Sequence, residues 1–151
     1  IKEQSRKHGA FGMGYTYGGH PVSCAVAIET LKIYEERDMI GHVQSVAPHF
    51  LERLCELSDI SIVSEARGVG LIAALELVSD KSSRAQFSPD AKAAPAIAAS
   101  ALARGLVVRA LPGDVIGICP PLIIENTQVD ELFDKLAAAV TETEALLRKA
   151  A

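Results

Sequence analysis

Short apolar runs with the character of strands alternate along this chain of 151 residues with longer runs that have the spacing of helices. Four short runs read ISIV at 60–63, LIAALELV at 71–78, LVVRAL at 106–111 and VIGIC at 115–119. They are mostly β-branched or aliphatic and are separated by glycine- and proline-containing segments, which is typical of strands. RGVG at 67–70 predicts a turn between the first two runs, and PGD at 112–114 predicts one between the last two.

Four longer segments predict helices. Pro21 suits a first helical position, and the residues that follow it are apolar on nearly every side, which predicts a buried helix. A stripe from Met39 to Leu54 predicts an amphipathic surface helix. The alanine-rich segment 91–104 favours helix, with Gly105 placed to end it in a left-handed conformation. In the last segment Thr127 is the predicted N-cap, with Asp130 three residues on, ahead of a long apolar stripe. Together these elements predict an α/β fold, more closely a small α+β domain in which two or three helices cover one face of a small sheet.

Composition and charge narrow the class of protein. The formal net charge is −4 and the 15 lysines and arginines are dispersed, which argues against nucleic acid as the main partner. Three cysteines (Cys24, Cys55 and Cys119) lack the spacing of a disulfide framework or a zinc site, so no metal is predicted. No signal peptide and no run of membrane-spanning length is seen, which predicts a cytoplasmic protein that contacts no membrane. The first residue is Ile rather than Met, which suggests a fragment of a longer protein.

The segment YTYGGHPV at 15–22 is the first candidate site. Its glycines let backbone amides turn toward a ligand, Thr16 offers a hydroxyl, and a helix with free amides and a positive dipole end begins directly afterwards. These features suit a phosphate or another anion. The residues alone favour, by a small margin, an ordinary glycine-rich turn that leads into a buried helix.

The order of motifs resembles that of one enzyme family. FGMGYTYGGHPV at 11–22 is followed by EARGVGLIAALELV at 65–78, GLVVRAL at 105–111 and ICPPLII at 118–124. In this order they resemble the C-terminal portion of the class III, omega-type aminotransferases, enzymes of fold type I that use pyridoxal 5′-phosphate. One departure from the family pattern is Met13, which stands where many members have histidine.

The resemblance implies roles for two loop residues. Tyr15 and Thr16 match the aromatic residue and the threonine that help to hold the cofactor phosphate of the neighbouring subunit, so it implies a homodimer. Thr16 is then expected to donate its hydroxyl to a phosphate oxygen.

Arg109 is the second candidate site. It shares a strand face with Val107 and Leu111, so we expect a partly buried guanidinium that needs an anionic partner. The residues alone do not decide between an internal carboxylate and a ligand. The resemblance implies the ligand, because the matching arginine in many family members binds the substrate carboxylate and can swing aside for an amine that lacks one.

The chemistry also needs groups that cannot be placed in this sequence. Transamination requires a lysine that forms a Schiff base with the cofactor and a carboxylate on its pyridine nitrogen. The lysines here lie in segments predicted to be polar loops or helix faces, so no catalytic residue is predicted and the fragment alone is expected to be inactive. Residues 1–37 are predicted to be a remnant of the large cofactor-binding domain and 38–151 the C-terminal small domain.

The complete protein is predicted to transfer an amino group from an amine or omega-amino acid to an oxo acid such as pyruvate. An aminomutase or a decarboxylase of the same family is an alternative. A non-catalytic α/β module that binds a protein partner is another.

Overall fold

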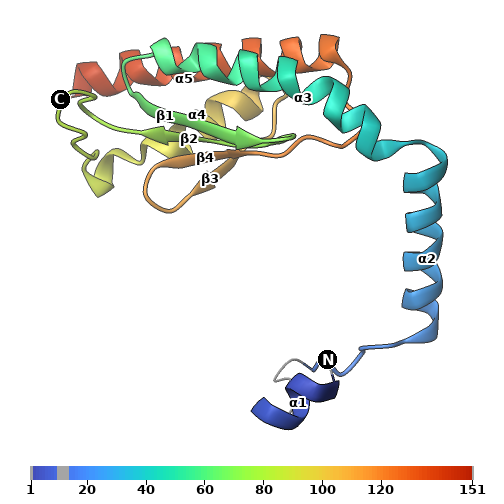
Figure 1. The fold of residues 1–151 in the computed structure, drawn as a ribbon. Helices are drawn as coiled ribbons and strands as arrows, with labels where there is room; N and C mark the ends of the chain where they lie inside the picture. The colour runs from blue at the N-terminus through green and yellow to red at the C-terminus, as the bar shows by residue number, and fades with distance from the viewer. Residues whose placement is uncertain (1, 10–13, 151) are drawn as a thin grey trace. The chain divides into compact units, whose positions relative to one another are not determined.

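The computed structural model describes residues 2–9 and 14–150 and divides the chain into two compact units, Ile1–Asp38 and Met39–Ala151 (Figure 1). Part of the first quoted motif, including Met13, lies outside the described residues. The assignment of residues 1–37 to a large domain stays a prediction, because a division of the chain does not show what else the first unit packs against.

The first unit contains helices α1 (Lys2–His8) and α2 (Pro21–Glu36). Pro21 is the first residue of α2, as predicted. The prediction that this helix is buried is wrong for this chain: none of its residues is buried, and Val22, Val26 and Leu31 are each more than 60% exposed. A helix that is apolar on nearly every side needs cover from several elements, and the described part of the first unit supplies only one other short helix.

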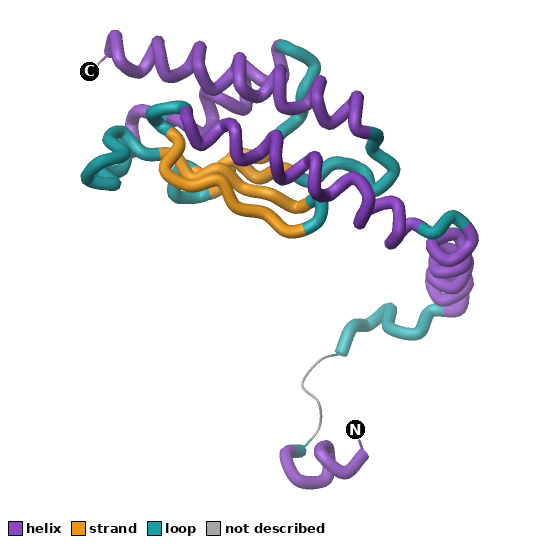
Figure 2. The backbone as a smooth tube through the Cα atoms, turned by 45° about the horizontal axis from the view of Figure 1, so that its top comes forward, coloured by secondary structure: helices purple, strands orange, loops and turns teal. Residues whose placement is uncertain are grey.

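The second unit is a four-stranded antiparallel sheet with helices on one face. The strands are β1 (Val63–Val69), β2 (Ile72–Leu77), β3 (Arg109–Leu111) and β4 (Val115–Ile118), in the order β1-β2-β4-β3. The helices are α3 (Met39–Glu56), α4 (Ala93–Ala103) and α5 (Asn126–Ala150), with single 3-10 turns at Leu57–Asp59 and Pro89–Ala91. Figures 1 and 2 show α3, α4 and α5 on one side of the sheet and no helix of the second unit on the other side. The predicted small sheet with helices on one face is confirmed.

Strand boundaries differ from the prediction in two places. β1 begins at Val63, so most of ISIV precedes it, and the strand contains Arg67 and Gly68, which were predicted as a turn. The turn is confined to Gly70 and Leu71, with Gly70 at a φ of +57° that favours glycine. A Cβ on Gly68 would lie 3.0 Å from Leu51 Cδ2 of α3 and 2.8 Å from the Ile72 carbonyl oxygen. This glycine therefore permits close packing of strand and helix and is not a turn residue.

The ends of two helices test the predicted caps. Gly105 follows α4 with a φ of +76°, which confirms the predicted left-handed cap. Thr127 as the N-cap of α5 is wrong, because the helix already begins at Asn126. The Gln128 side chain instead accepts a hydrogen bond of 3.0 Å from the Glu125 N–H, as in the second half of a capping box that starts at Glu125.

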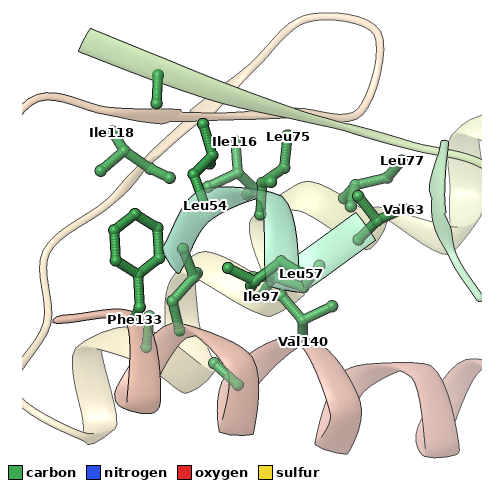
Figure 3. Close-up of a cluster of buried hydrophobic side chains, with 14 of the residues drawn as sticks. Leu54, Leu57, Val63, Leu75, Leu77, Ile97, Ile116, Ile118, Phe133 and Val140 are labelled. Atoms are coloured by element: carbon green, nitrogen blue, oxygen red, sulfur yellow. The ribbon is translucent and has the colours of Figure 1, made fainter. Parts of the chain in front are cut away.

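The core lies between the sheet and the helices (Figure 3). Inward-facing Leu75 and Ile116 of the sheet meet Leu54 of α3, Ile97 of α4 and Phe133 of α5, all at most 1% exposed. The Phe50 and Phe133 rings meet edge to face with centroids 5.0 Å apart. The helical face of the sheet is thus filled by the chain's own side chains, which leaves the opposite face as the one open to ligands or other parts of the protein.

His42 anchors the segment that leaves β4. Its Nε2 lies 3.0 Å from the Ile124 carbonyl oxygen and donates a hydrogen bond to it, which ties the segment after Cys119 to α3. In the described part of the chain no helix is both long and apolar enough to cross a membrane.

Candidate functional site

The loop ahead of α2 is a pair of hydrogen-bonded turns. The Gly18 N–H donates to the Tyr15 carbonyl oxygen at 2.9 Å, and the His20 N–H donates to the Tyr17 carbonyl oxygen at 3.2 Å. These turns leave Thr16 exposed and Tyr15 75% exposed. His20 occupies the N-cap position of α2 but makes no side-chain cap hydrogen bond.

The loop fits a phosphate by the chemistry of its donors. The first amides of a helix have no partner within the helix, and here no capping side chain occupies them. Residues 14–21 and the first turn of α2 contain no carboxylate that would repel an anion. The Thr16 hydroxyl and the helix N-terminus could therefore serve one phosphate group.

Arg109, the second predicted site residue, lies on the open face of the sheet in a row of four directly paired residues. Arg67 pairs with Ala74, Ala74 with Gly117, and Gly117 with Arg109, so one row crosses all four strands. Directly opposite residues of antiparallel strands share a face. Since Ala73, Leu75 and Ile116 point into the core, the row lies on the side away from the helices.

Arg109 is exposed, which corrects the prediction of a partly buried guanidinium. Val107, on the same side, is 83% exposed. Arg109 begins the edge strand β3 and Val107 lies just before it, and both line the face that no helix of the second unit covers. Among the described residues, the Arg109 side chain finds no hydrogen-bond or ion-pair partner, so the alternative of an internal carboxylate partner has no support.

A hollow of about 660 Å³ lies over this row. Its lining includes Arg67, Ile72, Ala74, Arg109, Gly117 and Cys119. This volume is within the usual range for small-molecule sites, and most of the lining is apolar with a guanidinium at each end.

The two arginines differ in charge balance. Arg67 Nη1 lies 2.9 Å from Glu76 Oε2 and 3.4 Å from Glu65 Oε2. Glu65 and Glu76 lie directly opposite each other on β1 and β2. Arg67 therefore reduces the repulsion between these two carboxylates, and they in turn neutralise its positive charge. Arg109 therefore remains the unneutralised cation of the hollow.

Neither Arg67 nor Gly117 was predicted as a site residue. Arg67 was assigned to a turn, and Gly117 was noted only as part of a predicted strand. The available signal was strand alternation: continuing the first strand through Ala66 and Gly68 would have placed Arg67, which lies between them, on the face opposite the core.

The described lysine side chains supply no site for a covalently bound cofactor. Lys32 pairs with Glu29, Lys135 pairs with Glu131, and Lys81 donates to the Ser58 carbonyl oxygen. Lys7, Lys92 and Lys149 are exposed. None of these side chains lies in a buried apolar site of the kind that holds a lysine for Schiff-base formation. No three His, Cys, Asp or Glu side chains of the described residues gather where they could hold a metal ion.

These features define a small α+β domain whose open sheet face presents an unpaired cation beside an apolar hollow, a class of domain suited to recognising an organic anion. The family model "Aminotransferase class-III" matches residues 2–140, and the chain belongs to this family. Family members depend on pyridoxal 5′-phosphate, whose phosphate is the kind of anion that the Thr16 loop suits.

The chain is similar to plant and bacterial transaminases. It is 45% identical over 144 residues to the probable gamma-aminobutyrate transaminase 3, mitochondrial, of Oryza sativa subsp. indica, covering 95% of this chain and 28% of that protein. It is 43% identical to the gamma aminobutyrate transaminase 3, chloroplastic, of Solanum lycopersicum, with the same coverage. A PMP-bound aminotransferase structure from Vibrio fluvialis superimposes with a TM-score of 0.83 at 34% identity, covering 95% of this chain and 32% of that one.

Two consequences follow from these matches. The chain spans less than a third of the length of these relatives, which agrees with the predicted correspondence to a portion of a longer enzyme. The predicted cytoplasmic location is wrong by this comparison, because the matched plant proteins are named for mitochondria and chloroplasts.

Proposed function

We propose that the complete protein transfers an amino group from an amine or omega-amino acid to an oxo acid such as pyruvate, and that this chain forms its C-terminal small domain together with a short part of the large one. The family match and the transaminase names of its relatives support this proposal. The matches described above give no support to a mutase, a decarboxylase or a non-catalytic partner-binding module.

The observation that carries the proposed role of this chain is the unpaired Arg109 guanidinium at the hollow. A guanidinium presents a planar pair of N–H donors that matches a carboxylate in two-point contact. Arg109 binds and orients the substrate carboxylate and takes no part in proton transfer. Because it is exposed and has no partner among the described residues, it can turn away when a substrate lacks a carboxylate.

The loop ahead of α2 has the second proposed role. Thr16 donates its hydroxyl to a phosphate oxygen of the cofactor, with Tyr15 beside it, and in a homodimer this phosphate belongs to the neighbouring subunit. The cofactor, when bound, supplies the electron sink that transamination requires. The chain's own residues contribute binding and orientation, and the covalent lysine is proposed to lie in the part of the protein that precedes this chain.

A matched pair of amino donors tests the role of Arg109 in the full-length protein. 4-Aminobutanoate and butylamine have chains of the same length and differ by one carboxylate. Loss of a charge-assisted contact is worth about 1.5–3 kcal/mol, so Arg109→Ala is expected to lower kcat/KM for 4-aminobutanoate by about 10- to 100-fold. Turnover of butylamine with pyruvate should change by less than about threefold on the same scale.

Arg148→Ala is the control, because Arg148 is an exposed arginine of α5 that pairs with Glu144 outside the hollow. Arg148→Ala should leave kcat/KM for both amino donors unchanged. An equal loss for the two donors in Arg109→Ala would show that the arginine does not recognise the carboxylate. Absence of transamination by the wild-type protein, across a panel of amines and oxo acids, would refute the proposed reaction itself.

A further inference from the structure

We infer that Gly117 is a specificity-determining residue that limits which carboxylate substrates fit beside Arg109; this inference rests on the proposed function. Gly117 is the direct cross-strand neighbour of Arg109 on one side and of Ala74 on the other. The two smallest residue types thus occupy the two middle positions of the row between Arg67 and Arg109. These four residues form the floor of the hollow. Neighbouring strands lie about 4.8 Å apart, so this floor is about 14 Å long from Arg67 to Arg109.

The space above Gly117 is part of the hollow, and a side chain there would take it up. A Cβ on Gly117 would lie 3.1 Å from Leu111 Cδ1 and 3.7 Å from the Arg109 carbonyl oxygen. The first contact is with the mobile end of a side chain, so a methyl group is tolerated after a small shift of Leu111. The further carbons of a valine would project over the floor, where they would displace a ligand and not core side chains.

The absence of a side chain at position 117 is not required by the backbone. Gly117 lies inside β4 and is not among the glycines with positive φ. Glycine in a strand interior costs stability and is found where another group approaches the backbone closely. Leu111 approaches one side of this position, and Gly117 otherwise lines the hollow beside the unpaired Arg109 guanidinium, so we assign the remaining space above Gly117 to the substrate.

The charges at the two ends of the floor orient the substrate. Arg67 is compensated by Glu65 and Glu76, whereas Arg109 has no acidic partner in the described part of the chain. A carboxylate is therefore bound at the Arg109 end, and its hydrocarbon chain lies across Gly117 toward Ala74. Ile72 and Leu111 supply apolar surface along this path.

The test uses the full-length protein and the variants Gly117→Val and Gly117→Ala. A misfit of one to a few carbons in a binding site changes kcat/KM by about 10- to 200-fold. Gly117→Val should therefore raise KM for 4-aminobutanoate by about 10-fold or more, with kcat changed less. Gly117→Ala should fall between wild type and Gly117→Val. Butylamine, which has no carboxylate to bind at Arg109, should retain its kinetic constants in both variants.

Val115→Ile is the matched control. Val115 lies on the same strand and the same face two residues before Gly117, and it does not line the hollow. Val115→Ile should leave KM and kcat for both amino donors unchanged. Thermal unfolding followed by circular dichroism checks that each variant is folded, and Gly117→Ala carries the test if Gly117→Val is not.

Binding of pentanoate to the protein without substrates, measured by calorimetry, separates this inference from the proposed reaction. Pentanoate has the carboxylate and the hydrocarbon chain but no amino group, so it reports on the hollow whether or not the protein transaminates. Its affinity should fall by about 10-fold or more in Gly117→Val. Equal effects on 4-aminobutanoate and butylamine, or unchanged pentanoate binding, would overturn the role of Gly117. Loss of all transamination with pentanoate binding intact would instead remove the proposed reaction and leave the binding floor in place.

Discussion

Phe133 is the residue at which the packing of α5 on the sheet can be tested most directly. It is 1% exposed and meets Phe50 edge to face at 5.0 Å. Phe133→Ala removes a fully buried ring and leaves a cavity between α3, α5 and the sheet. Such changes cost about 3–5 kcal/mol of unfolding free energy. With a urea dependence of about 2 kcal/mol per M, the unfolding midpoint should fall by roughly 2 M.

The assay is urea unfolding of the 151-residue chain followed by far-ultraviolet circular dichroism. Leu146→Ala is the control on the same helix, because Leu146 is 60% exposed and its truncation should change the unfolding free energy by less than about 0.5 kcal/mol. Comparing Phe50→Ala, Phe133→Ala and the double variant isolates the ring pair, which should contribute about 0.5–1.5 kcal/mol. A loss below about 1 kcal/mol for Phe133→Ala would refute the packing described for the core.

Two further predictions concern the loop after β2 and the loop before α2. Hydrogen bonds from the Ser83 hydroxyl, the Ser82 hydroxyl and the Ser82 N–H lower the pKa of Asp80 to about 2 from an ordinary 3.8. Asp80 therefore stabilises the folded state above about pH 4, and this contribution disappears as the pH falls toward 2. Ser83→Ala should raise the Asp80 pKa in an NMR titration of the carboxyl carbon, and an unchanged pKa would show that the Ser83 contact is not formed. In the full-length protein Thr16→Ala should weaken binding of pyridoxal 5′-phosphate by about 10- to 100-fold, as expected for one hydrogen bond to a charged group, while Thr16→Ser should retain affinity because it keeps the hydroxyl. Equal cofactor affinity in wild type and Thr16→Ala, measured by fluorescence titration, would exclude the proposed phosphate contact.

Much of the fold could be predicted from local signals. The 3.6-residue stripe around Phe133 predicts α5 and its buried face, and Gly105 predicts the end of α4, because both depend only on neighbours in the sequence. The order of the four motifs along the chain indicates the right family, because each motif consists of adjacent residues. The cap of α5 was misplaced by two residues because threonine is a common N-cap, while the interaction that forms is between Gln128 and the Glu125 amide.

The bounds of β1 and the exposure of α2 could not be predicted from the local sequence. Arg67-Gly68 looks like part of a turn because glycine usually marks one, yet Gly68 lies in β1 where Leu51 approaches it closely. The burial of α2 was also mispredicted, because apolar composition shows that a helix needs cover but not which part of a protein provides it.

The sequence by itself determined the elements, the class of fold and the family, because these depend on periodicity and on motifs that can be recognised along the chain. Only the tertiary structure decided that Arg67 and Arg109 stand at opposite ends of one row, with Ala74 and Gly117 between them. It also decided that one arginine is neutralised and the other is not. The physical reason is that strand pairing joins residues far apart in the sequence, and a shift of one residue in register would turn each of these side chains to the other face of the sheet.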